Sequence, residues 1–187
     1  MLKILRSTLV IALLAVAPLA ADETPAMQAF FAGVTSLQNA AVEPTFRQQQ
    51  EGWHEAELHF RDAVKLKSDY ADAYNKLGQS LFNQDNVFDA ITELKNAVSI
   101  DPRLTEAWYN MGFCFENITT DKRIKDDPKT QKKMAKTNVA QAIKAYSKAI
   151  EVTPTNDLNA LAKSHFRLGV LLRDQSRGDG GGRIAAT

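Results

Sequence analysis

The chain has 187 residues, 44% hydrophobic and 24% charged, which is typical of a folded globular protein with one compact domain or one short array of repeats. Its 23 lysines and arginines nearly balance its 22 aspartates and glutamates, so a nucleic-acid-binding protein with a basic stripe and a high pI is not expected. Cys114 is the only cysteine, which excludes an intramolecular disulfide and a cysteine-based zinc site.

Residues 1–21 have the pattern of a secretory signal peptide. Lys3 and Arg6 precede an apolar run that begins at Leu9, and small residues follow this run. The run is shorter than the ~20 residues that span a bilayer, so an uncleaved anchor is the less favoured alternative. Cleavage after residue 20 or 21 would remove two positive charges and change the net charge from +1 to −1. The sequence predicts an exported protein of the periplasm or the extracellular or secretory space, which does not span a membrane after cleavage.

The next segment predicts one helix over about 25–39 and a second over 53–66, joined by the stretch 40–50. The letters HEAELH in the second helix are close to the zinc motif His-Glu-x-x-His. His54 and His59, however, are five residues apart and lie about 140° from alignment on a helix, so one ion cannot be held by both. We therefore expect no metal site.

A repeat with a period of 34 residues begins in this second helix and continues to residue 116. Residues of similar size recur at the same place in successive periods, and Pro102 closes the better preserved unit. The pairs are Ala56 and Ala90, Phe60 and Leu94, Ala63 and Ala97, Tyr74 and Trp108, Leu77 and Met111, Gly78 and Gly112, and Leu81 and Phe115. So many matched pairs at one spacing indicate a repeat architecture.

The order aromatic-x-x-Leu-Gly, then Ala-x-x-x-bulky-x-x-Ala, then Pro resembles the tetratricopeptide repeat, in which each unit is two antiparallel helices. The best match is 71–104, and the resemblance extends over about 50–175. It implies an all-α solenoid over residues 22–176, with about three units and a C-terminal capping helix. We expect the glycines of the pattern to lie where paired helices approach closely, with Ala90 and Ala97 as the facing small surface. The structural positions of the repeat are Tyr74, Leu77, Gly78, Ala90, Ala97, Pro102, Trp108, Gly112, Ala142, Ala149, Pro154 and Gly169.

The third unit, 105–154, is interrupted by an insert at about 120–137. Asp127 is placed to cap a helix with Pro128 at its first position, so the second helix of this unit is predicted over about 128–152. The insert has a net charge of +4, from seven lysines and arginines against three aspartates. It is interpreted as a solvated loop and helix overhang, or alternatively as a contact surface for an acidic partner or an anionic head group.

The last unit repeats the Leu168-Gly169 step but has no second helix after it. A lone terminal helix of this kind typically covers the exposed end of a solenoid. Residues 177–187 contain four glycines and no apolar period, so a flexible tail is expected there.

In the family that the chain resembles, residues that contact a ligand come mainly from the first helix of each pair. The corresponding positions here are Asn75, Gln79, Phe82, Asn83, Tyr109, Asn110, Phe113, Glu116, Lys163, Phe166, Arg167 and Val170. Their four aromatic side chains are expected to form an apolar stripe within a polar groove. The alternative is that part of this stripe packs beneath neighbouring helices.

One subgroup of the family grips the C-terminal carboxylate of a partner with Lys and Asn from one unit, Asn from the next, and Lys and Arg from the third. Here Asn110, Lys163 and Arg167 match the second and third parts. Asn75 and Gln79 replace the Lys and Asn of the first part, so the clamp is incomplete. The chaperones that such a clamp usually serves are not exported.

The resemblance implies a protein–protein interaction scaffold or adaptor that binds an extended peptide or a helix in the concave groove, without a cofactor. The sequence does not support an enzyme, since it shows no phosphate-binding glycine loop and no Ser-His-Asp order, and Cys114 is expected to be a buried, inert thiol. The alternatives are a structural or assembly factor that acts by self-association or membrane docking, and a truncated module of a larger enzyme.

Overall fold

The computed structural model describes residues 24–124 and 126–180, and within these two ranges the regular structure is helical, without a strand. The predicted signal peptide, 1–21, lies outside the described residues. The elements are α1 (Pro25–Val42), α2 (Phe46–Leu66), α3 (Ala71–Asn83), α4 (Val87–Ile100), α5 (Thr105–Glu116), the short 3₁₀ helix η1 (Ile118–Thr120), α6 (Pro128–Val152) and α7 (Leu158–Gly180).

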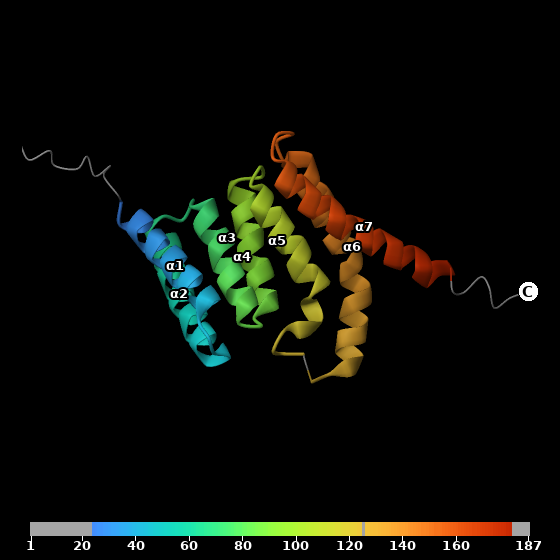
Figure 1. Ribbon diagram of the computed structural model, residues 1–187, viewed down its shortest axis with the longest axis horizontal. Helices are drawn as coiled ribbons and strands as arrows, with labels where there is room; N and C mark the ends of the chain where they lie inside the picture. The colour runs from blue at the N-terminus through green and yellow to red at the C-terminus, as the bar shows by residue number, and fades with distance from the viewer. Residues whose placement is uncertain (1–23, 125, 181–187) are drawn as a thin grey trace, which may run out of the picture.

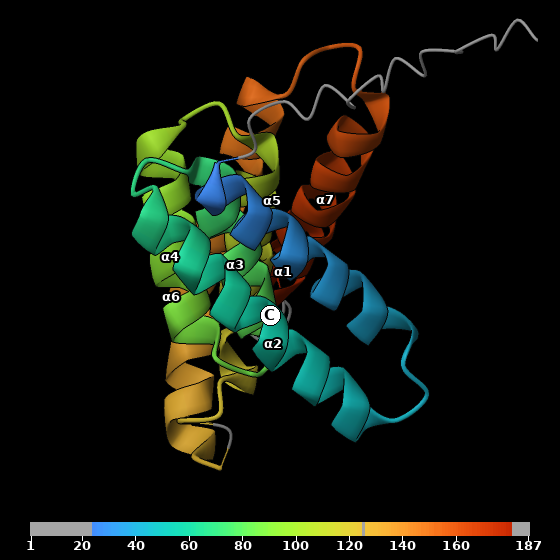
Figure 2. The ribbon, with the colours of Figure 1, turned by 90° about the vertical axis from the view of Figure 1, so that its left-hand side faces the viewer.

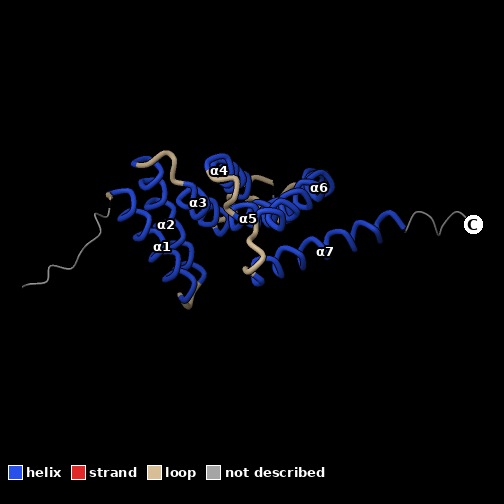
Figure 3. Tube along the Cα trace, turned by 90° about the horizontal axis from the view of Figure 1, so that it is seen from above, coloured by secondary structure: helices blue, strands red, loops and turns tan. Residues whose placement is uncertain are grey.

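The helices form three antiparallel pairs, α1–α2, α3–α4 and α5–α6, which stack side by side, and α7 lies at the end of the stack (Figure 1). Figure 2 looks along the stack from its α1–α2 end, with α7 at the back. Seen from above, α4 and α6 lie on one side of the stack, and α3, α5 and α7 follow one another on the other side (Figure 3). This arrangement confirms the predicted all-α solenoid of about three helix pairs with a terminal helix.

A large side chain of the second helix covers a glycine of the first helix in each pair. The facing residues are Gly33 with Phe60, Gly78 with Leu94, and Gly112 with Tyr146. A Cβ atom added at any of these glycines would lie only 2.7 or 2.8 Å from the facing side chain, so no larger residue fits without a shift of the helices. The expectation of a small facing surface is therefore wrong in part. Leu94, and not an alanine, makes the nearest contact to Gly78, and the carbonyl oxygen of Ala90 lies beside it at 3.2 Å.

The apolar core follows the repeat pattern. Leu77 and Leu81 are buried within it, and Ala90, Leu94 and Ala97 are fully buried on α4. The two large aromatic positions of the pattern are less enclosed. Tyr74 and Trp108 are only half-buried at the edge of the core, and the indole Nε1 of Trp108 donates a hydrogen bond of 2.9 Å to the carbonyl oxygen of Pro102.

The first pair is longer than the sequence predicts, because most of the stretch 40–50 is helical. Only 43–45 separate α1 from α2, since Pro44 cannot continue α1 and Thr45 caps α2 by accepting a hydrogen bond of 3.3 Å from the Gln48 backbone N–H. Gly52 then allows close approach of the two helices: a Cβ there would lie 2.7 Å from that of Ala40.

The later helices begin where the local signals place them. Helix α6 starts at Pro128, and the Asp127 carboxylate accepts hydrogen bonds from the backbone N–H groups of Lys129 (3.1 Å) and Thr130 (3.2 Å), as predicted. Helix α7 continues to Gly180, so the expected tail of 177–187 is wrong in its first four residues, because extending an existing helix costs far less than starting one. Residues 181–187 lie outside the described residues.

Candidate functional site

Two clefts adjoin on the side of the stack formed by α3, α5 and α7. The first, here called the aromatic cleft, has a volume of about 270 Å³ and is lined by Gln79, Phe82, Asn83, Phe113 and Arg167, among others. The second, here called the polar cleft, has a volume of about 570 Å³ and is lined by Asp101, Arg103, Glu106, Asp157 and Lys163, among others. Tyr109 and Asn110 of α5 line both clefts, so the two clefts adjoin at these residues and are together called the groove.

Aromatic and cationic groups in contact with one another form the wall of the aromatic cleft. The ring centroids of Phe82 and Phe113 lie 5.1 Å apart, so successive first helices contribute one apolar surface. The guanidinium of Arg167 lies over the Phe113 ring, 4.8 Å from its centroid. An apolar side chain that enters this cleft would therefore meet two phenyl rings and a fixed positive charge.

Glu116 holds Arg167 in this position. One carboxylate oxygen of Glu116 accepts a hydrogen bond of 3.2 Å from Arg167 Nη1, and the other accepts one of 2.8 Å from the Tyr146 hydroxyl. Burial, together with the hydrogen bond to Glu116 and its negative charge, raises the pKa of Tyr146. The sequence places Glu116 among the groove residues, but both of its oxygens are already used, so it acts as a support for Arg167 and does not line either cleft.

An asparagine pair connects the first helices of two successive units. The Asn75 side chain is 0% exposed, and its Oδ1 accepts a hydrogen bond of 2.9 Å from Asn110 Nδ2. Asn75 therefore orients Asn110 from below, which corrects the expectation that it faces a ligand. Gln79 does line the aromatic cleft, and its Oε1 is buried without a hydrogen-bond partner in the described part of the chain.

The terminal helix brings only part of its predicted residues to the groove. Arg167 lines the aromatic cleft and Lys163 the polar cleft. Phe166 is 69% exposed and lines neither cleft, and Val170 also lines neither. The aromatic stripe expected from the sequence thus has three members in the groove, not four. The physical reason is that Phe166, one residue before Arg167, is rotated about 100° away from it around the helix.

The polar cleft also includes residues that the sequence did not single out. Asp101 and Arg103 come from the α4–α5 connection and Asp157 from the α6–α7 connection. The groove positions predicted from the resemblance all lie on the first helix of a pair, so residues of the connections were not among them. Asp157 also caps α7, because its carboxylate accepts a hydrogen bond of 3.0 Å from the Ala160 backbone N–H. The available signal was an aspartate next to a helix end, Asp101 directly after α4 and Asp157 directly before α7.

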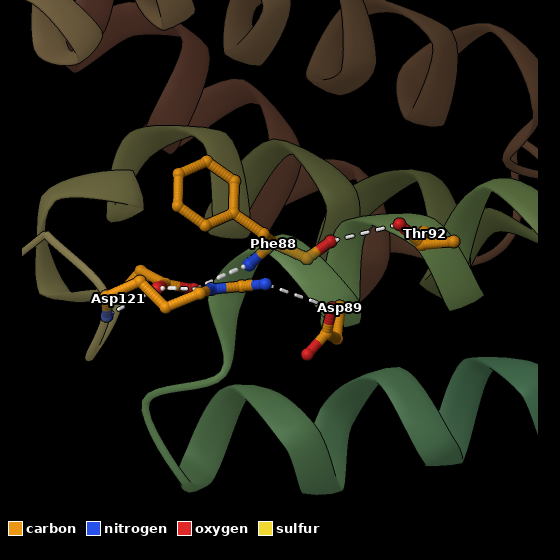
Figure 4. Close-up of polar contacts among 5 residues, drawn as sticks. Phe88, Asp89, Thr92 and Asp121 are labelled. Atoms are coloured by element: carbon orange, nitrogen blue, oxygen red, sulfur yellow. Dashed lines mark hydrogen bonds and ion pairs between the residues drawn. The ribbon is translucent and has the colours of Figure 1, made fainter.

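The insert is anchored to the preceding unit through one buried carboxylate (Figure 4). Asp121 is 0% exposed and accepts hydrogen bonds from the Phe88 backbone N–H (2.9 Å), the Arg123 backbone N–H (2.8 Å) and Arg123 Nε (2.9 Å). It thereby caps α4, which has no side-chain cap from its own preceding residue. Arg123 pairs with Asp89 as well, at 3.3 Å, and its guanidinium lies 4.7 Å from the Phe88 ring centroid. One of the seven basic residues of the insert is therefore committed to the fold.

We predict that Asp121→Ala lowers the free energy of unfolding by about 2–3 kcal/mol, because it removes a helix cap and charge-assisted hydrogen bonds. Burial acts to raise the pKa of Asp121, but the hydrogen bonds from Arg123 and Phe88 outweigh it and hold this pKa below its usual 3.8. The stabilisation of the fold by the ionised Asp121 carboxylate is therefore complete above about pH 4, and it is lost as the pH falls through the lowered pKa.

The difference in stability between wild type and Asp121→Ala should therefore persist at neutral pH and shrink only below about pH 4 in urea unfolding. Asp126→Ala, a change at an exposed aspartate of the same insert, serves as the control and should have little effect. A neutral-pH difference under ~0.5 kcal/mol would contradict the capping role.

Cys114 is buried, and burial raises the pKa of its thiol to about 12, in agreement with the expected inert thiol. His54 and His59 lie beside Glu57 and Glu55 of their own helix, at 3.6 and 4.0 Å. In residues 24–124 and 126–180, no three His, Cys, Asp or Glu side chains are grouped so that they could hold a metal ion. None of the described helices is long and apolar enough to cross a membrane.

Comparison with known proteins agrees with this architecture. Residues 71–104 match the sequence profile of the tetratricopeptide repeat, the same segment that the sequence pattern singles out. The first TPR of Spaghetti (RPAP3), solved bound to the HSP90 peptide SRMEEVD, has a TM-score of 0.52 and 12% identity, with 79% of this chain and 95% of that chain covered. The structure of MamA has a TM-score of 0.51 and 17% identity, with 86% of this chain and 84% of that chain covered. No curated protein sequence matched this chain.

The chain therefore carries a tetratricopeptide repeat at residues 71–104, within a helical array that has the fold of this family. The resemblance inferred from the sequence is confirmed.

Proposed function

We propose that the protein is an adaptor that binds an extended peptide of another protein in the groove formed by α3, α5 and α7. The observation that carries this proposal is that the aromatic and polar clefts adjoin at Tyr109 and Asn110. An extended chain can place an apolar side chain between Phe82 and Phe113 and its polar groups against the second cleft. A peptide-bound structural neighbour supports a protein ligand, as does the general role of tetratricopeptide repeat proteins as scaffolds without enzymatic activity.

The two clefts together carry as many acidic as basic residues, but the charged residue of the aromatic cleft is Arg167, which favours a peptide with an acidic group beside its apolar anchor. Arg167 stands at the aromatic cleft, and Lys163 at the polar cleft, with Asn110 between them. The neighbouring Spaghetti domain was solved with a peptide whose last residues are Glu-Glu-Val-Asp. A terminal carboxylate would not be fully clamped, because the buried Asn75 takes the place of the first lysine of the clamp.

We predict that Phe113→Ala weakens the binding of such peptides by about tenfold or more, because it removes the ring that contacts both Phe82 and Arg167. Peptides are selected from a displayed library on the full chain, and their affinity for wild type and variant is measured by fluorescence anisotropy. Phe113→Ala is preferable to a change at Tyr109, whose ring lies 5.6 Å from that of Tyr146 and so also supports the core.

The matched control is Phe31→Ala, which truncates an exposed phenylalanine of α1 outside the groove and should leave the affinity unchanged. The thermal midpoint of each variant is recorded in parallel. Equal affinity of wild type and a folded Phe113→Ala variant would show that the peptides bind elsewhere.

We also propose that the protein is exported, on the basis of the charge and apolar pattern of residues 1–21. When the full chain is expressed with its own N-terminus in a secreting host, the exported fraction should contain a shorter protein that begins at residue 21 or 22. N-terminal sequencing identifies this start. An uncut chain that stays in the cytosol would contradict the proposal.

A further inference from the structure

The first turns of α6 carry lysines on one side of the helix. The sequence places them at 129, 132, 133 and 136, and the spacing i, i+3, i+4, i+7 puts these positions within about 100° of one another around the helix. No other position of 128–137 falls within this arc. Lys129, Lys132 and Lys133 are exposed, and these three residues are here called the lysine stripe.

The opposite side of α6 holds the helix on the array, which fixes the direction of the lysine stripe. Ala142, Ala145 and Ala149 are buried, and Met134 packs against the main core. At 100° per residue, these four residues and the lysine stripe are centred on nearly opposite sides of the helix. The first turns of α6 also lie at one edge of the array, away from α7 (Figure 1). The lysine stripe therefore points to solvent.

The charges of the lysine stripe are not used within the fold. None of its three lysines forms an ion pair with a residue that the structure describes. The sequence of α6 has no aspartate or glutamate before Glu151, and Glu151 pairs with Lys148 at 2.6 Å. Of the two aspartates directly before the helix, Asp127 caps it, which leaves Asp126 as the other acid at this end. The surface is therefore predominantly positive.

The composition of the lysine stripe indicates what it can bind. Protein interfaces rely on buried aromatic, methionine or arginine anchors and are depleted in lysine. The arc of the lysine stripe contains no such anchor. Lysine presents a hydrated point charge on a flexible stem, which suits a diffuse layer of anionic head groups that requires no fixed geometry. The lysine stripe thus fits the surface of an anionic membrane better than it fits an acidic protein.

We propose that the lysine stripe docks the protein on a membrane surface rich in anionic lipid head groups. The contact is electrostatic and peripheral, because the stripe has no apolar side chain that could enter the hydrocarbon layer. The stripe lies on the side of α6 that faces away from α5, whereas the groove lies on the side of α3, α5 and α7 (Figure 3). Docking therefore leaves the groove open, and it does not depend on the proposed binding of a peptide.

Sedimentation with vesicles tests this docking. The full chain is mixed at low ionic strength with vesicles of phosphatidylcholine alone, or of equal parts of phosphatidylcholine and phosphatidylglycerol, and the bound fraction is measured. We expect at least about tenfold stronger binding to the anionic vesicles, which falls as salt is added because exposed charges are screened. The triple variant Lys129→Gln, Lys132→Gln and Lys133→Gln should weaken binding to the anionic vesicles by about tenfold or more.

The matched control removes the same charge elsewhere, through Lys65→Gln, Lys67→Gln and Lys95→Gln at three exposed lysines outside α6. It should bind the anionic vesicles nearly as well as the wild type does. Glutamine is a good helix former, so both triple variants should keep the thermal midpoint of the wild type. Residues 1–21 are the same in all three proteins, so a difference between them reports the lysines. Equal binding of the two triple variants, or no preference for anionic vesicles, would overturn the proposal.

Soluble polyglutamate tests the other occupant, an acidic protein. Its binding to the wild type and to the stripe variant is measured by fluorescence anisotropy at the same ionic strength. We expect the three substitutions to weaken vesicle binding by a larger factor than polyglutamate binding, because many head groups gather around the stripe at a membrane surface. The reverse order would assign the lysine stripe to an acidic protein and would overturn the proposal.

Discussion

Gly112→Leu should destabilise the protein by about 3 kcal/mol or more, because the new side chain must enter space filled by Tyr146. A Cβ atom at this position would already lie 2.8 Å from the Tyr146 ring, and that ring is itself fully buried and hydrogen-bonded to Glu116. The pair can accommodate the leucine only if α5 and α6 move apart. Urea unfolding, followed by circular dichroism, gives the change in free energy.

Gly169→Leu is the control for this result, since it makes the same substitution at the equivalent position of α7, where nothing lies within 4 Å. Leucine is a better helix former than glycine, so this variant should keep its stability or gain up to about 1 kcal/mol. Both variants are compared at a concentration at which the wild type is monomeric. Equal losses for the two would mean that glycine is needed for a reason other than the helix–helix contact.

Tyr146→Ala should cost about 3–5 kcal/mol, because it leaves a cavity between α5 and α6 and removes the ring that covers Gly112. The residue is 0% exposed and contacts Tyr109, with ring centroids 5.6 Å apart. Thermal and urea unfolding measure this loss. Trp108→Ala offers a comparison at another large aromatic position of the same pair. It should cost less, since its ring is only half-buried.

Tyr146→Phe separates packing from hydrogen bonding. It keeps the ring and removes only the hydroxyl that donates to Glu116, so a loss of about 1–2 kcal/mol is expected. Tyr146→Phe should weaken peptide binding at the groove more than it lowers stability. The reason is that Glu116 then loses one of the two partners that position it beside Arg167. If Tyr146→Phe were as destabilising as Tyr146→Ala, the ring would not be the main source of stability.

The sequence was sufficient to predict the elements whose signals are local. Asp127 followed by Pro128 marks the start of α6, and Pro102 follows the end of α4, because caps and prolines act within one turn. The extension of α2 back to Phe46 was not predictable in this way. Its first turns are exposed and carry a run of glutamines without an apolar period, so only their contact with α1 reveals them as helix.

The groove was predicted only as far as repeat register determines it. Phe82, Tyr109 and Phe113 do line the clefts, since equivalent positions of stacked helices face the same way. The burial of Asn75 depends on its hydrogen bond with Asn110, a contact between units that no local pattern contains. The position of Phe166 depends on how α7 is rotated about its own axis, which is set by packing against one helix pair and not two.

The carboxylate that caps α4 comes from Asp121, which lies in the following unit of the sequence. The connection before α4 has a further tie in the same place, since the backbone N–H of Lys122 donates a hydrogen bond of 2.8 Å to the Asp85 carbonyl oxygen. A fragment cut at the boundaries of the sequence period, 71–104, would lack both ties. During synthesis on a ribosome, the second helix pair could reach its final stability only after residue 123 had emerged. The segment that folds as a stable unit is therefore longer than the sequence repeat.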